Sequence, residues 1–219
     1  MELIQFDAHL SMRARIVRLA IAWPMDALGI ALLLRAKLGV APFDVMNTGV
    51  SKVTGMAFMW AYLLASLVGF GLGALLGVKI GPANVIGTFV IGPMITLGLR
   101  LINPPAAIGL RVAFLVVATL LLGAAISLVI TTELGVGPVE AVMLGMIKRG
   151  LPIVASRWIS DGVPLVVGLV LGGAIGVGTV VVGVALGPLI KLCLGWLHYE
   201  PRGARPGSGI APTAIQTQG

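Results

Sequence analysis

The stretch LGVAPFDVM, residues 38–46, stands among long apolar runs and returns as LGVGPVEAV at residues 134–142. In both copies a glycine is followed three positions later by a proline, and the proline two positions later by an acidic residue. Proline is favoured in the first turn of a helix because its missing N–H has no intrahelical partner there, and a preceding glycine allows a sharp turn. The first helix would cover residues 42–53, roughly 18 Å, which is too short to cross about 30 Å of hydrocarbon. Each stretch therefore predicts a short half-helix that begins at membrane depth.

The acidic residue in each stretch has two interpretations. The residues expected to begin the half-helices are Gly39, Pro42, Gly135 and Pro138, with Asp44 and Glu140 in the first turns. In one interpretation the two carboxylates only cap N–H groups that have no partner within the helix. In the other, the two helix starts meet at a polar cavity that Asp44 and Glu140 line, because an ionisable group inside a membrane is costly and commonly functional.

Composition identifies the chain as a membrane protein. Hydrophobic residues make up 58% of the 219 residues, and charged residues only 11%. Apolar runs recur at about the 20 residues that a transmembrane helix needs. The expected spans are residues 16–34, 56–78, 84–101, 106–130, 159–174 and 177–197. We therefore predict an all-α polytopic membrane protein with about six transmembrane helices.

The chain has a net charge of +7, and its Lys and Arg residues lie between and beside the apolar runs. Their positions indicate membrane topology and argue against a nucleic-acid partner. With the N-terminus inside, nine positive residues fall on the inner face: Arg13, Arg15, Arg18, Lys79, Lys148, Arg149, Arg157, Arg202 and Arg205. Five fall on the outer face: Arg35, Lys37, Lys52, Arg100 and Arg111. Since cytoplasmic loops carry the excess of Lys and Arg, we expect both termini in the cytoplasm and the chain in the inner membrane.

The sequence contains two copies of one unit. A shift of 96 positions lays residues 38–52 over residues 134–148, so that Asp44 falls on Glu140. A shift of 95 positions lays residues 81–99 over residues 176–194. One residue was therefore gained or lost between the two matching blocks.

The repeat divides the chain into four parts. Repeat 1 is placed at residues 16–105 and repeat 2 at residues 106–197, with a cytoplasmic segment at residues 1–15 and a disordered tail at residues 198–219. Because each copy holds three spans, the second copy enters the membrane from the opposite side. The prediction is two inverted 3+3 repeats, each with a short half-helix, an arrangement common in secondary transporters.

Glycines spaced by four residues recur in both copies, at Gly73, Gly77 and Gly81 and at Gly168, Gly172 and Gly176. This spacing puts small residues along one face of a helix, where a neighbouring backbone can approach closely. The predicted role is helix packing, and the alternative is a face along which another helix slides.

Two further acidic residues lie in or near the spans. Asp26 follows Pro24 in the middle of the first span, where the proline would interrupt the backbone hydrogen bonds and open carbonyl groups to a cavity. Its other interpretation is a structural partner for a neighbouring helix. Asp161 follows Arg157 by four residues, which predicts a helical ion pair near the inner face. Together with Asp44 and Glu140, these two acids form the candidate pathway for a substrate or a proton.

Motifs of soluble active sites are missing from the sequence. It contains no HExxH, no GxxxxGK and no paired cysteines, and its two histidines, His9 and His198, lie in the terminal regions. No nucleophile and base can be named, so we expect no enzyme activity, no cofactor and no metal site.

Four segments together resemble one known family: LGVAPFDVMNTGVSKVTG (38–55), GPMI (92–95), LGVGPVEAV (134–142) and LGGAIGVGTVVVGVALGPLI (171–190). This pattern resembles the YczE/YyaS/YitT-type family of bacterial integral membrane proteins over about residues 20–197. Phe43 stands where that family frequently has a tryptophan. The resemblance implies a fold and a membrane location far more than an activity.

The expected function is transport of a small polar or charged solute across the inner membrane, coupled to protons through Asp26, Asp44 or Glu140. The alternative is a membrane scaffold that assists or anchors another enzyme. The expected partners are the lipid bilayer and a small solute, and a homodimer is left open. Short loops favour transport, since a scaffold needs a surface outside the bilayer.

Overall fold

The computed structural model describes residues 10–199 of the chain, and this part is built of helices. The helices are α1 (Met12–Ala36), α2 (Pro42–Thr54), α3 (Phe58–Leu75), α4 (Pro82–Leu101), α5 (Ile108–Thr132), α6 (Pro138–Lys148), α7 (Ile153–Val170) and α8 (Val177–Trp196). Six of them, all except α2 and α6, are long and apolar enough to cross a membrane. The all-α polytopic fold is therefore confirmed. The cytoplasmic segment predicted at residues 1–15 and the disordered tail predicted at residues 198–219 lie largely outside the described residues.

The two half-helices begin at the prolines that the sequence singles out. α2 has Pro42 in its first turn and contains 13 residues, and α6 has Pro138 in its first turn and contains 11 residues. At about 1.5 Å per residue, neither reaches across about 30 Å of hydrocarbon. Gly39 precedes α2 with a φ of 108°, a backbone conformation that favours glycine.

The fifth span begins earlier than predicted. The sequence places it at residues 159–174, whereas α7 runs over Ile153–Val170 with Pro152 at its N-cap. Arg157, which precedes the predicted span, and Asp161, near its start, both lie inside the helix and are buried. The Nε atom of Arg157 lies 2.9 Å from a carboxylate oxygen of Asp161. Because the two charges offset one another, both side chains can be buried in the protein interior. A scan for apolar residues starts too late for this reason.

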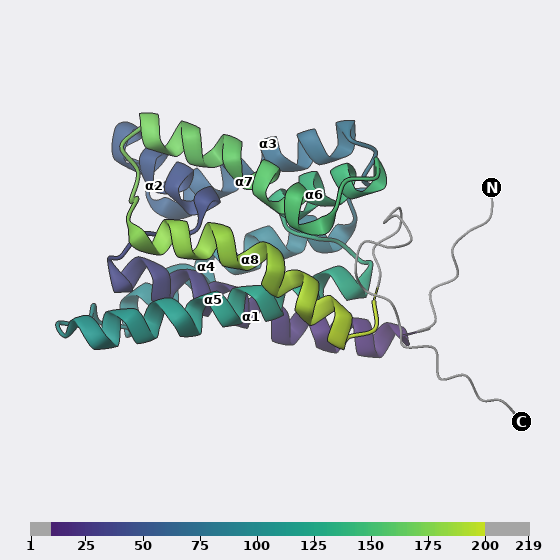
Figure 1. The fold of residues 1–219 in the computed structure, drawn as a ribbon, viewed down its shortest axis with the longest axis horizontal. Helices are drawn as coiled ribbons and strands as arrows, with labels where there is room; N and C mark the ends of the chain where they lie inside the picture. Colours follow the sequence, from purple (N-terminus) through teal and green to yellow (C-terminus); the bar gives the residue numbers. More distant parts are fainter. Residues whose placement is uncertain (1–9, 200–219) are drawn as a thin grey trace, which may run out of the picture.

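The helices form two layers, which Figure 1 shows one above the other. In one layer α1 packs along α5, with α4 against α1 and α8 against α5. In the other layer α2 packs against α7, and α6 packs against α3. The start of α1 and the end of α8 lie at the same end of the bundle, while α2 and α6 lie towards opposite ends (Figure 1).

Contacts between the two halves of the chain are reciprocal. The ammonium group of Lys52 donates to the carbonyl oxygen of Gly172 at 3.2 Å, and that of Lys148 donates to the carbonyl oxygen of Gly77 at 2.9 Å. The repeat shifts convert one contact into the other, since Lys52 corresponds to Lys148 and Gly77 to Gly172. Each half-helix therefore packs on a long helix of the other half. The inversion of the halves across the membrane stays a prediction.

The glycines spaced by four do not form one continuous helix face, in contrast to the prediction. Gly73 lies within α3 and Gly168 within α7, but Gly77 and Gly172 follow the ends of these helices with positive φ angles. Gly81 and Gly176 are the N-cap residues of α4 and α8.

Four of these six glycines lie where backbones come close. A Cβ atom at Gly73 would lie 2.6 Å from the Cβ of Ala141, and one at Gly168 would lie 2.5 Å from the backbone nitrogen of Met46. A Cβ atom at either N-cap glycine would lie 2.2 Å from a carbonyl oxygen, that of Leu134 or that of Leu38. A larger residue at any of the four would push a half-helix, or the segment before it, away from its neighbour.

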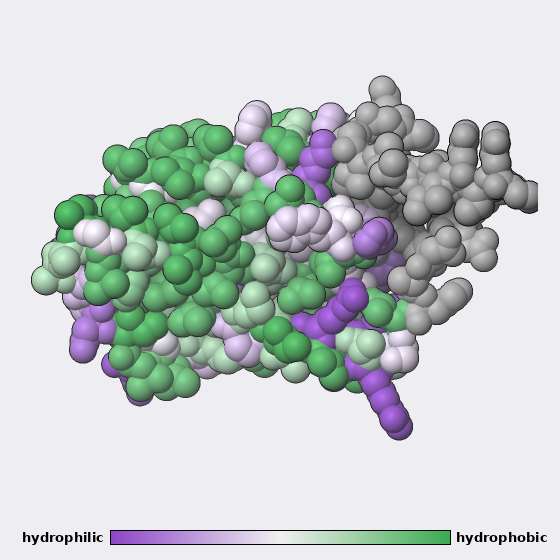
Figure 2. All heavy atoms as spheres, turned by 60° about the horizontal axis from the view of Figure 1, so that its bottom comes forward, coloured by the Kyte–Doolittle hydropathy of each residue, from purple (hydrophilic) through white to green (hydrophobic). Residues whose placement is uncertain are grey.

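A broad hydrophobic surface covers most of the face that Figure 2 shows, and the hydrophilic residues on this face gather towards its ends. Large apolar side chains such as Leu75, Leu101 and Val170 are strongly exposed. Soluble proteins rarely expose apolar patches of such extent, so this surface fits contact with lipid. Contact with lipid explains the apolar surface but does not explain the charged side chains that are buried in the interior.

Candidate functional site

A cavity of about 90 Å³ lies where the helices of both layers meet, and every one of the eight helices contributes to its wall. One buried water needs at least about 10–15 Å³ by this kind of measure, so the cavity has room for several waters or one small solute. Three carboxyl side chains line it, those of Asp26, Asp44 and Glu140. The structure thus brings together three of the four acids that the sequence predicts as a pathway.

Glu140 reaches the cavity from the first turn of α6 and is paired with Arg157 of α7. The guanidinium group of Arg157 donates from its Nη1 atom to the Oε1 atom of Glu140. Its Nε atom donates to Asp161 at 2.9 Å. All three side chains are buried, and Arg157 is only 3% exposed. Since the two carboxylates share one guanidinium group, a single positive charge holds α6 against α7.

Asp44 occupies the matching position in the first turn of α2 and is also buried. Its Oδ1 atom accepts a hydrogen bond from the side-chain amide of Asn47 at 3.2 Å. The residue before the helix, Ala41, gives no side-chain cap. Within residues 10–199 the Asp44 carboxylate accepts no hydrogen bond from a backbone N–H and forms no ion pair. The capping interpretation therefore lacks the hydrogen bond that it requires.

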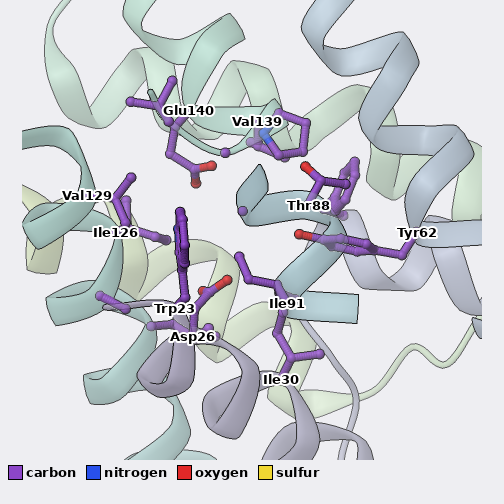
Figure 3. Close-up of a pocket in the computed structure, with 18 of the residues that line it drawn as sticks. Trp23, Asp26, Ile30, Tyr62, Thr88, Ile91, Ile126, Val129, Val139 and Glu140 are labelled. Carbon is purple, nitrogen blue, oxygen red and sulfur yellow. The ribbon is translucent and has the colours of Figure 1, made fainter. Parts of the chain in front are cut away.

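Asp26 enters the cavity from α1 and is partly buried. Figure 3 shows its carboxylate directed into the cavity from the side opposite Glu140. α1 continues as a helix through Pro24, which has no N–H to donate, so one backbone hydrogen bond of the helix is missing there. In the part of the chain that the structure describes, the Asp26 side chain forms neither a hydrogen bond nor an ion pair. A structural role as the hydrogen-bonded partner of a neighbouring helix is thus not supported.

The rest of the wall is mainly apolar and aromatic. Trp23, Phe43 and Tyr62 line the cavity, together with aliphatic side chains from α1, α4 and α5. The rings of Phe43 and Tyr62 meet edge to face, with centroids 6.0 Å apart. Figure 3 shows the hydroxyl groups of Tyr62 and Thr88 directed into the cavity from one side. Few neutral polar groups are therefore available to solvate the three carboxylates.

The fourth predicted acid, Asp161, does not line the cavity and lies behind Arg157. Its predicted ion pair with Arg157 is present, but the pair is buried and extends to Glu140. Arg157 was assigned to the charges of the inner face, whereas it lies in the wall of the cavity. A signal for this role was available, because the shift of 95 places Arg157 on Tyr62, another residue of the wall.

The carboxylates of the cavity are not arranged for metal binding. Across residues 10–199 no group of three His, Cys, Asp or Glu side chains is positioned to hold a metal ion. Hard cations such as Ca²⁺ take six to eight oxygen ligands, whereas the cavity wall is mainly apolar.

The fold and the cavity define a polytopic α-helical membrane protein with a buried acidic site. The chain belongs to the family of unknown function DUF6198, whose model matches residues 13–195. It is also similar to an uncharacterized protein of Haemophilus influenzae, with 27% identity over 175 residues, which cover 80% of each chain. No solved structure matches the chain. The match to DUF6198 does not carry the YczE/YyaS/YitT name, so that resemblance stays an expectation.

Proposed function

We propose that this protein transports a small polar or positively charged solute across the membrane in exchange for, or together with, protons. The observation that carries the proposal is the cavity that Asp26, Asp44 and Glu140 line, with Arg157 as its one cationic side chain among residues 10–199. A buried carboxylate without a partner is costly, and intramembrane acids commonly mark ion and proton pathways. A proton or a cationic solute would supply the missing positive charge.

The arrangement of the half-helices supports transport. In many secondary transporters the solute site lies near the bilayer midplane, at the interface between repeats, and interrupted helices end at that site. Here α2 and α6 begin beside the cavity, and each packs on a long helix of the other half. The reciprocal contacts of Lys52 and Lys148 support the inference that the halves are inverted repeats. Rocking of one repeat against the other would then open the cavity to alternate sides.

We further propose that the chain resides in the inner membrane with both termini in the cytoplasm. The excess of Lys and Arg on one side of the spans supports this orientation. The start of α1 and the end of α8 at one end of the bundle agree with it (Figure 1). The motifs shared with the YczE/YyaS/YitT-type family support the same location.

Reconstitution into liposomes tests transport directly. The purified full-length chain is sealed into vesicles that contain the pH-sensitive dye pyranine, and a panel of amines, amino acids and inorganic ions is added outside. We expect at least one solute to change the internal pH faster than in protein-free vesicles, and Asp44→Asn to abolish the change. Glu133→Gln is the matched control, because it removes one negative charge outside the cavity.

A scaffold function predicts a different result. The connections between helices are short within residues 10–199, which leaves little surface outside the bilayer for a partner enzyme. If no solute of the panel is moved and an enzyme co-purifies in fixed ratio, the transport proposal fails and the scaffold function replaces it.

A further inference from the structure

The two repeats contribute equivalent positions to the cavity. The shift of 96 pairs Ile30 with Ile126 and Phe43 with Val139, and the shift of 95 pairs Ile91 with Leu186. All six residues line the cavity. The two halves of the wall therefore contain equivalent positions. Where equivalent positions carry different charges, the two halves can bind different ligands.

The charges of the two halves differ at two of three matched positions. Asp44 and Glu140 are both acidic, but Arg157 corresponds to Tyr62, and Asp161 corresponds to Ser66. In repeat 2, Glu140 is paired with the guanidinium group of Arg157. In repeat 1, the equivalent acid is Asp44, and the neutral phenol of Tyr62 occupies the position equivalent to Arg157.

Asp26 increases this difference. Its counterpart by the shift of 96 is Leu122, which lines the cavity as well. The half of the wall from repeat 1 therefore carries two carboxylates and no cation. In residues 10–199 one oxygen of the buried Asp44 carboxylate accepts from Asn47, and no hydrogen bond reaches the other.

We infer that the repeat 1 half of the cavity, with Asp26 and Asp44 as its anionic groups, binds a small organic cation such as an alkylammonium ion. This inference rests on the proposed function and specifies the class of its solute. Glu140 and Asp161 share the guanidinium group of Arg157, which offsets one of their two negative charges. Asp26 and Asp44 have no cationic partner among residues 10–199, so most of the negative charge available to a ligand lies on their side.

The wall around these two carboxylates suits an organic cation better than an inorganic one. The faces of aromatic rings attract cations, and Trp23, Phe43 and Tyr62 line the cavity. Alkyl groups on nitrogen would contact the aliphatic side chains that make up much of the remaining wall. A metal ion finds no group of three His, Cys, Asp or Glu side chains placed to hold it among the described residues.

The intrinsic fluorescence of Trp23 offers a direct measurement of binding. The chain has four tryptophans, and the other three, Trp60, Trp158 and Trp196, are exposed. Replacing these three by phenylalanine leaves Trp23 as the one reporter, inside the cavity. The full-length variant in detergent is titrated with methylammonium or tetramethylammonium chloride, and with sodium or potassium chloride at the same ionic strength.

We expect a saturable change of Trp23 fluorescence with the organic cations and none with sodium or potassium. Loss of a charge-assisted contact should weaken binding at least about tenfold in Asp26→Asn and in Asp44→Asn. The control Glu133→Gln should bind within about threefold of the parent, since position 133 lies outside the cavity. Thermal unfolding of the wild-type chain, which needs no substitution, should shift to higher temperature with the organic cations.

Three results would overturn the inference: equal responses to sodium and potassium, no saturable response together with no thermal shift, or unchanged affinity in both aspartate variants. Failure of the proposed function is distinguishable. If alkylammonium ions bind but vesicles take none up, the site stands and transport fails. If vesicles move another solute and no organic cation binds, transport stands and this site assignment fails.

Discussion

Lys52 donates a hydrogen bond to the carbonyl oxygen of Gly172, 3.2 Å away, and so ties the half-helix of the first repeat to the end of α7 in the second. The same tie in the opposite sense joins Lys148 to Gly77 at 2.9 Å. The two hydrogen bonds are equivalent, because Lys52 corresponds to Lys148 and Gly172 to Gly77 in the two repeats. If the halves are inverted, these two ties lie on opposite faces of the membrane.

The first prediction is that residues 37 and 148 face opposite sides of the membrane. In a Cys193→Ser background, Lys148→Cys should react with a membrane-impermeant maleimide from the cytoplasm, and Lys37→Cys from outside, since each native side chain is exposed in the structure. Labelling in intact cells and in inverted vesicles measures this. Reaction of both positions from one side would show that the spans are miscounted and would exclude inverted repeats.

The second prediction concerns Gly73 and Gly71 on the same helix. A Cβ atom at Gly73 would lie 2.6 Å from the Cβ of Ala141 on α6, whereas one at Gly71 meets nothing within 4 Å. Gly73→Ala should therefore lower the free energy of unfolding by about 1–3 kcal/mol through overpacking. Gly71→Ala should leave it unchanged or raise it by up to about 1 kcal/mol through helix propensity.

Thermal unfolding in detergent measures the stability of Gly73→Ala and Gly71→Ala. Gly168→Ala and Gly162→Ala repeat the comparison on α7, because a Cβ atom at Gly168 would lie 2.5 Å from the backbone of α2 and one at Gly162 meets nothing within 4 Å. Equal stability of Gly73→Ala and Gly71→Ala would mean that α6 does not pack closely on α3.

The third prediction is that Arg157 is required for a stable fold. Removing one partner of a buried ion pair leaves an uncompensated charge and typically costs about 3–5 kcal/mol. Arg157→Gln leaves two such carboxylates, those of Glu140 and Asp161, so we expect a loss at the upper end of that range. The triple variant with Glu140→Gln and Asp161→Asn should recover much of the loss, because it also removes the stranded charges.

Arg100→Gln provides the control for Arg157, since Arg100 is exposed near the end of α4. Its unfolding temperature should match that of the wild type. If Arg157→Gln unfolds at the wild-type temperature as well, the guanidinium group does not hold α6 and α7 together.

Much of the fold follows from local patterns in the sequence. Each span needs only a run of apolar residues, and each half-helix start needs only a proline after a glycine, so Pro42 and Pro138 are found without any tertiary information. The early start of α7 escapes such a pattern. The buried charge of Arg157 is stabilised by Glu140 on α6, 17 residues earlier in the chain. A scan for apolar residues does not detect that pairing.

The candidate site was predictable in its residues and less so in their roles. The acids at positions 26, 44 and 140 stand out because charge is rare in the spans. Which of them lacks a partner depends on where Arg157 points, and a side-chain direction across two helices is not encoded in sequence spacing. The match of Arg157 with Tyr62 in the repeat is the one sequence feature that carries part of this information.

The last prediction separates Asp44 from Glu140, whose positions in the two half-helices match. Asn at position 44 keeps an oxygen that accepts from Asn47, so Asp44→Asn should fold with near wild-type stability. It removes the negative charge, however, and solute movement in liposomes should cease. Glu140→Gln should instead weaken the bond to Arg157 and lower the free energy of unfolding by about 1.5–3 kcal/mol, while transport persists. Asp44→Ala should be less stable than Asp44→Asn, because alanine also removes the acceptor. If vesicles with Asp44→Asn move their solute at the wild-type rate with unchanged pH dependence, the Asp44 carboxylate has no part in transport.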